Sequence, residues 1–116
     1  MVAQRILVID DQVPIVELVA DILSDAGYEV TAVADPGPLL SPDRPALDYD
    51  LMVIDIVMPQ IDGITLRQLL RRSGCRCPTL FITGLVNHRF ADPGRNILHK
   101  PFRPQELLDS VNRLLT

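Results

Sequence analysis

Five short aliphatic runs, each bounded by polar or turn-forming residues, constrain the fold of this chain more than any other feature. They cover residues 6–9, 29–33, 51–56, 79–83 and 97–99. The first is rich in β-branched residues and has no polar alternation, which is typical of a strand buried on both faces. Strands of this kind separated by crossover segments predict an α/β fold with a parallel sheet.

The segments between the strands differ in their helical signal. Apolar residues recur at helical spacing after Pro14, with Gly27 suited to the C-terminal cap, and again after Gly63 and after Pro104. The second crossover holds Pro36, Pro38, Pro42 and Pro45, and an interior proline costs a helix about 3 kcal/mol, so we expect at most a turn or two there. Since the fourth crossover must fit between Gly84 and His99, its helix must be short or missing.

Length and charge limit the classes of function. At 116 residues the chain has the size of one domain, taken as residues 1–116, with no room after the last helix for an output domain. The net charge of −4 and the scattered basic residues argue against direct nucleic-acid binding. The N-terminal apolar run is too short for a signal peptide or membrane span, so we expect a cytoplasmic protein without membrane contact, whose Cys75 and Cys77 stay reduced.

Polar residues at the ends of four predicted strands suggest a site for chemistry. Asp10 and Asp11, Asp55, Thr83 and Lys100 each follow such a run. In an open parallel sheet these ends share one edge, where ligands bind. Mg²⁺ prefers oxygen ligands, so Asp11 and Asp55 are candidate direct ligands and Asp10 a ligand through water. Taken singly, the two acids at 10 and 11 are also consistent with helix capping, Thr83 with a strand-end hydroxyl and Lys100 with a solvated charge.

Four motifs closely resemble the receiver domain of bacterial two-component response regulators. They are Ile-Leu-Val-Ile-Asp-Asp at 6–11, Asp-Ile-Val-Met-Pro-Gln-Ile-Asp-Gly at 55–63, Phe-Ile-Thr-Gly at 81–84 and Lys-Pro-Phe at 100–102. The resemblance covers essentially the whole chain. It implies a flavodoxin-like (βα)₅ doubly wound fold with strand order 2-1-3-4-5.

The resemblance also implies roles for the site residues. Asp55 would be the phosphoacceptor, phosphorylated by a phosphohistidine of a sensor kinase or a histidine phosphotransfer protein. Mg²⁺ would be held by Asp10, Asp11, Asp55 and the backbone carbonyl of Val57. Lys100 would contact the incoming phosphoryl group, and Thr83 would move to bond it.

We therefore interpret the chain as a stand-alone phosphoacceptor, not an enzyme, that signals to an unknown downstream protein or passes the phosphoryl group on. One alternative is a receiver-like interaction module whose output does not depend on phosphate. A less favoured one is a phospho-aspartate phosphotransferase or phosphatase of the haloacid dehalogenase type. Such enzymes need an acid two residues after the nucleophile, where this chain has Val57.

Several positions depart from the family pattern. Ile97 stands where receivers commonly have an aromatic residue, and the fourth crossover is short, so we expect residues 85–95 to form the partner-facing element. Val57 and Leu85 are apolar at positions that help to place the hydrolytic water, which predicts slow self-dephosphorylation. Arg103 precedes Pro104 where a capping Ser, Thr or Asp would be better by about 1 kcal/mol. We expect the basic face of Arg67, Arg71 and Arg72 to be solvated, with contact to an acidic partner as the less favoured alternative.

Overall fold

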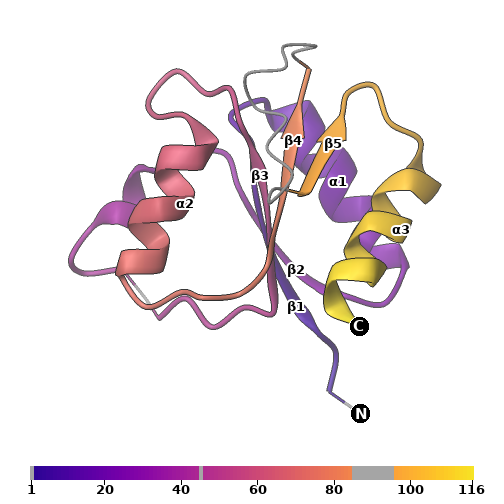
Figure 1. Cartoon of the computed structure of the whole chain (residues 1–116), viewed down its shortest axis with the longest axis horizontal. Helices are drawn as coiled ribbons and strands as arrows, with labels where there is room; N and C mark the ends of the chain where they lie inside the picture. Colours follow the sequence, from indigo (N-terminus) through magenta and orange to yellow (C-terminus); the bar gives the residue numbers. More distant parts are fainter. Residues whose placement is uncertain (1, 45, 85–95) are drawn as a thin grey trace.

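The computed structural model describes residues 2–44, 46–84 and 96–116. Five parallel strands form one sheet in the order β2-β1-β3-β4-β5 (Figure 1). The strands are β1 (Arg5–Ile9), β2 (Glu29–Val33), β3 (Leu51–Asp55), β4 (Thr79–Thr83) and β5 (Asn96–His99). The predicted flavodoxin-like α/β fold is therefore confirmed, with strand boundaries within one residue of those expected.

Burial along the strands follows their place in the sheet. Every residue of the central strands β3 and β4 is buried, whereas the edge strand β2 contains only exposed and half-buried residues. Successive side chains of a strand point to opposite faces, so Ile6 and Val8 join one core cluster while Leu7 and Ile9 join the other. The unbroken aliphatic runs in the sequence are the consequence of packing on both faces.

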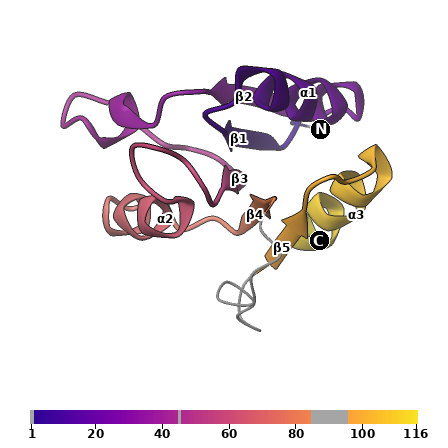
Figure 2. The same ribbon diagram turned by 90° about the horizontal axis from the view of Figure 1, so that it is seen from above.

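The helices form a layer on each side of the sheet. Helices α1 (Val13–Asp25) and α3 (Pro104–Leu115) pack together on one face, and α2 (Gly63–Arg72) lies with the 3₁₀ turn η1 (Gly37–Leu40) on the other (Figure 2). Within the described ranges, no helix combines the length and the apolar character needed to cross a membrane.

The helix ends show which residues cap each helix. Gly27 and Gly74 adopt positive φ angles of 100° and 101° after α1 and α2, as left-handed C-terminal positions require. At the start of α2, the carboxylate of Asp62 accepts hydrogen bonds from the N–H and the hydroxyl of Thr65, at 2.8 and 2.7 Å. At the start of α3, the Glu106 carboxylate accepts the N–H of Arg103 at 2.9 Å, so half of a capping box compensates for the weak cap that Arg103 supplies.

The structure tests the prediction for only one of the two irregular crossovers. The proline-rich second crossover contains the single turn η1, which confirms the prediction of at most a turn or two. The expected short or missing fourth helix, and the proposed partner-facing element at residues 85–95, lie outside the described residues.

Candidate functional site

The predicted site residues meet at the carboxyl edge of the sheet. Asp10 and Asp11 directly follow β1, Asp55 ends β3, Thr83 ends β4, and Lys100 directly follows β5. The chain winds from β1 outward to β2 and then returns to β3 on the opposite side of β1. The acids therefore lie where the winding reverses, which is the general ligand position in such sheets.

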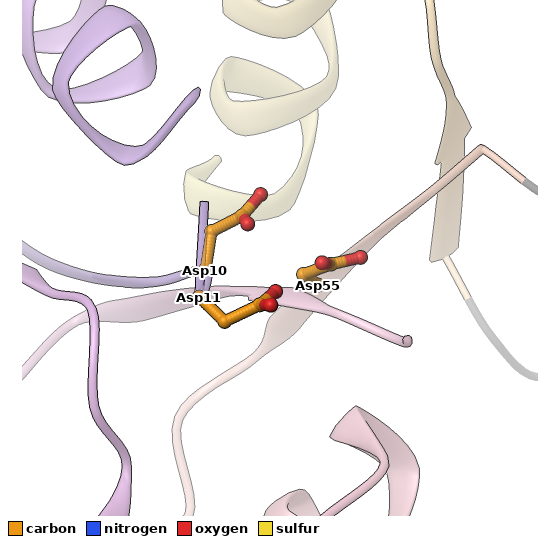
Figure 3. Close-up of side chains that lie close together, drawn as sticks. All are labelled: Asp10, Asp11 and Asp55. Carbon is orange, nitrogen blue, oxygen red and sulfur yellow. The ribbon is translucent and has the colours of Figure 1, made fainter. Parts of the chain in front are cut away.

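Three carboxylates converge at this point. Asp10, Asp11 and Asp55 each present an oxygen within 4.8 Å of the others (Figure 3). Asp55 is only 4% exposed, and Asp10 is also buried. One oxygen of Asp10 accepts the N–H of Gln12 at 2.9 Å, and one oxygen of Asp55 accepts the N–H of Val57 at 3.3 Å. These backbone bonds fix the two carboxylates where their charges repel.

Lys100 places one positive charge against this cluster. Its Nζ atom lies 3.1 Å from Oδ2 of Asp10 and 3.8 Å from Oδ2 of Asp55. Its backbone N–H donates a 2.7 Å hydrogen bond to the carbonyl of the buried Thr83, which joins the ends of β5 and β4. The hydroxyl-bearing residue and the ammonium-bearing residue are therefore held together through the main chain.

Burial makes the charge of Asp55 costly. It raises the pKa of Asp55 from 3.8 to about 7, and the charge of Asp10 adds to the rise. Lys100 and the Val57 N–H oppose the shift without reversing it. Additional positive charge is needed to keep Asp55 ionised and nucleophilic at neutral pH.

The donor set fits a hard divalent cation. Among the described residues, Oδ1 of Asp11 is buried and has no hydrogen-bond partner, which is unfavourable for a carboxylate oxygen unless a ligand satisfies it. Three carboxylates with oxygens this close match the chemistry of Mg²⁺, which takes oxygen ligands and retains several waters. The backbone of Val57 lies beside the Asp55 carboxylate.

A pocket of about 230 Å³ opens beside Asp55 and includes residues that the sequence interpretation missed. It is lined by Gln12, Asp55, Val57, Gly84 and Lys100. Gln12 directly follows Asp11, and Gly84 directly follows Thr83. Their positions next to predicted site residues were the sequence signal that could have identified them as pocket residues.

Gly63 belongs to the motif at 55–63, but the sequence did not predict its role, which is to let two segments of backbone approach closely. A Cβ atom there would collide with the carbonyl oxygen of Asp55, and the Gly63 N–H donates to the Ile56 carbonyl at 2.7 Å. The N-terminus of α2 thus packs directly on the backbone that carries Asp55. Only glycine permits this approach.

This arrangement can act on a negatively charged electrophile. A buried carboxylate faces an open pocket, and an ammonium group with a cation-binding set stands beside it. Such a site can neutralise charge on the equatorial oxygens of a phosphoryl group while a carboxylate oxygen approaches phosphorus.

Comparisons with known proteins agree on one family. Residues 6–112 match the family described as response regulator receiver domain. The chemotaxis protein CheY of Bacillus subtilis is 28% identical over 118 residues, which cover 97% of this chain and 98% of that protein. The response regulator SaeR of Staphylococcus aureus is also 28% identical over 97% of this chain, but the match spans only 50% of SaeR. A crystal structure of a response regulator receiver protein from Sinorhizobium medicae superposes with a TM-score of 0.83 at 30% identity, covering 97% of this chain and 94% of that one.

Proposed function

This chain belongs to the response regulator receiver domain family, and from that premise we propose that Asp55 accepts a phosphoryl group from a phosphohistidine. The donor would be a sensor histidine kinase or a histidine phosphotransfer protein. The observation that carries the proposal is the meeting of Asp10, Asp11 and Asp55 around the ammonium group of Lys100. We further propose that residues 1–116 act as one receiver unit.

The transfer requires an ionised, positioned carboxylate. An oxygen of Asp55 forms the new bond to phosphorus as the bond between phosphorus and the donor histidine nitrogen breaks, and that nitrogen leaves with the electron pair. The Val57 N–H holds the Asp55 carboxylate by its other oxygen. Lys100 stabilises charge on the transferring group, since its Nζ atom already lies beside both Asp10 and Asp55.

Mg²⁺ is the proposed cofactor. Asp10, Asp11, Asp55 and the Val57 carbonyl would hold it, and the bound ion supplies positive charge to the phosphoryl oxygens. The buried oxygen of Asp11, which has no partner among the described residues, supports this assignment, because a bound cation would satisfy it.

The output would begin at Thr83. Phosphorylation adds close to two negative charges at the sheet edge, and the Thr83 hydroxyl is the group proposed to move toward them. The hydrogen bond from the Lys100 N–H to the Thr83 carbonyl would carry that movement to β5. A downstream protein would then read the altered surface, or the phosphoryl group would be passed on.

The donor protein would dock on an apolar surface beside the pocket. Leu18 is 50% exposed and lines a second pocket, of about 300 Å³, with Ile15, Lys100, Pro101 and Phe102. Val13 at the start of α1 is 49% exposed. An apolar patch of this kind beside a reactive group is typical of a protein interface.

Leu18→Asp tests this docking surface. We expect phosphotransfer from any sensor kinase that phosphorylates the wild type to fall by about tenfold or more, because an interface anchor is lost. Phosphorylation by acetyl phosphate should not change, since this donor is too small to use the surface. Leu40→Asp is the matched control, because Leu40 is 42% exposed on η1, away from the site. An equal loss in both variants would contradict the docking surface.

Intact mass measurement after incubation with acetyl phosphate and Mg²⁺ tests the phosphoacceptor. The wild type should gain one phosphoryl group, and Asp55→Asn should gain none. Asp21→Asn, an exposed acid in α1, is the matched control and should behave as the wild type. No gain in the wild type would favour an interaction module independent of phosphate. Continuous release of phosphate from the donor would favour an enzyme that turns over a small substrate.

A further inference from the structure

A third pocket, lined mainly by residues of α2 and β4, has a basic character. It has a volume of about 310 Å³ and lies between α2 and the face of β4 that carries Thr79 and Phe81. Arg67 and Arg71, one helical turn apart on α2, are its charged residues, and no acidic residue lines it among those that the structure describes. Within the described ranges, the pocket therefore carries positive charge that no lining carboxylate offsets.

Two polar groups of this pocket are buried without partners. Thr79 is only 8% exposed, and in the described part of the chain its hydroxyl makes no hydrogen bond. Arg67 donates from Nη2 to the Cys77 carbonyl at 3.1 Å, while its Nη1 is buried and likewise has no partner there. This corrects the expectation of a solvated face at Arg67, which is half-buried. Buried polar groups are normally satisfied, and exceptions call for a ligand or another explanation.

We propose that this basic pocket binds a carboxylate side chain presented by a partner protein. The two unpartnered groups, a guanidinium N–H and a hydroxyl, match the two oxygens of a carboxylate, whereas a phosphate would bring three strong acceptor oxygens. Ile64, Pro78 and Phe81 supply apolar wall for the methylene groups of a glutamate. The volume of this pocket is at the lower limit for small-molecule sites. A volume of this size suits one side chain of a partner protein together with the residue next to it in the partner's chain.

The site is distinct from the phosphoacceptor pocket. The residues that line the two pockets do not overlap, and Arg71 stands on the exposed side of α2, accessible to a macromolecule. Binding here therefore does not require phosphorylation of Asp55. A variant that loses the basic pocket should still gain one phosphoryl group from acetyl phosphate, so failures of the two proposals are distinguishable.

NMR titration of the ¹⁵N-labelled protein tests the proposal. The probes are N-acetyl-glutamate methylamide, its neutral counterpart N-acetyl-glutamine methylamide, and inorganic phosphate. We expect saturable shifts of the Thr79 and Arg67 amide signals with the glutamate probe alone.

Arg67→Gln and Thr79→Val should each weaken this binding by about tenfold, since each removes a hydrogen bond to a charged group. Arg72→Gln removes the same charge from the end of α2 outside the pocket and should change the affinity by less than about twofold.

Thermodynamic stability provides a second measurement on Thr79→Val. Because the substitution removes a buried hydroxyl that has no partner, the urea midpoint of the free protein should rise while carboxylate binding is lost. A lower midpoint would overturn the proposal, because it would mean that the hydroxyl is already satisfied. The absence of saturable shifts, equal binding of the glutamine probe, tighter binding of phosphate, or equal weakening by Arg72→Gln would each overturn it as well.

Discussion

At the scale of single residues, the site is governed by a conflict between burial and charge. Asp10, Asp11 and Asp55 crowd together with only Lys100 to offset them among the described residues. Burial, more than the neighbouring acids, drives the pKa of Asp55 upward. With a pKa of about 7, a large share of Asp55 in the free protein keeps its proton at neutral pH, although the residue must react as an anion. A bound cation would lower this pKa and favour the ionised form.

The raised pKa makes a prediction about stability and pH. In the metal-free protein, Asp55 holds its proton more tightly when folded, with a pKa of about 7, than at the ordinary value of 3.8. Its contribution to stability is thus fully present below about pH 4 and is lost as the pH rises through about 7. Relative to Asp55→Asn, the wild type should lose up to about 1.4 kcal/mol of unfolding free energy per pH unit across this window.

Urea unfolding in EDTA between pH 4.5 and 8 measures that difference. Groups that do not interact with Asp55 cancel in the comparison. At Asp62, for example, burial acts to raise the pKa but the hydrogen bonds from Thr65 lower it more, and this occurs in both proteins. A difference between wild type and Asp55→Asn that stays constant with pH would show that Asp55 titrates normally.

Val57 makes a prediction about the lifetime of the phosphoryl group. Its side chain is 51% exposed and lines the pocket beside Asp55, where it offers no polar atom to a water molecule. Slow self-dephosphorylation therefore stays a prediction, and Val57→Asn should shorten the half-life by about tenfold by orienting the attacking water. Val57→Leu is the apolar control. Loss of phosphoryl label from both purified proteins should be followed over time, and equal half-lives would contradict this role.

At the scale of secondary-structure elements, the contact between α2 and the end of β3 is the tightest constraint. Gly63 lies against the carbonyl of Asp55 and donates its N–H to the Ile56 carbonyl. Asp62 fixes the first turn of the same helix through Thr65. The helix start and the phosphoacceptor loop therefore form one packed unit.

Gly63→Ala tests this unit. Alanine should gain up to about 1 kcal/mol from helix propensity, but the collision with the Asp55 backbone should cost about 1–3 kcal/mol or more, so we expect net destabilisation. Gly84→Ala is the control, because a Cβ atom there meets no atom of the described residues within 4 Å. Unfolding in urea measures both variants. If Gly63→Ala were as stable as the control, the close approach would not constrain the site.

At the scale of the whole molecule, the sheet brings together groups that are far apart in the chain. Asp10 and Lys100 are separated by 90 residues and still form an ion pair at 3.1 Å. The site exists only when β1, β3 and β5 are paired with their neighbours in register. Ligand binding at this edge is therefore linked to folding of the whole sheet.

Mg²⁺ should consequently stabilise the whole molecule. At a Mg²⁺ concentration about 100 times its dissociation constant, the free energy of unfolding should rise by about 2.7 kcal/mol. Asp11→Asn should abolish most of this gain, because it removes the negative charge and replaces one oxygen of the carboxylate whose Oδ1 lacks a partner among the described residues. Urea midpoints with Mg²⁺ and with EDTA measure the effect, and Asp21→Asn should respond as the wild type does. An equal gain in Asp11→Asn would place the cation elsewhere.

Most of the fold and the candidate cluster were predictable from sequence for a physical reason. Strands buried on both faces leave unbroken aliphatic runs, and the ends of these runs mark the polar edge of the sheet, so the position of Asp55 at that edge could be predicted. The packing role of Gly63 could not be predicted, because it depends on the space left by the backbone at the end of β3. Arg67 was wrongly expected to be solvated, since helical spacing does not reveal a carbonyl acceptor such as that of Cys77 ten residues away.

The hydrogen bond between the Lys100 N–H and the Thr83 carbonyl also bears on how this protein can diverge. A substitution that displaces either strand end changes the position of the other, so effects at the two residues should not be independent. A double-mutant cycle would then give a coupling energy different from zero even if neither altered side chain touches the other. The effect of a substitution at one of these strand ends would consequently depend on the residue present at the other.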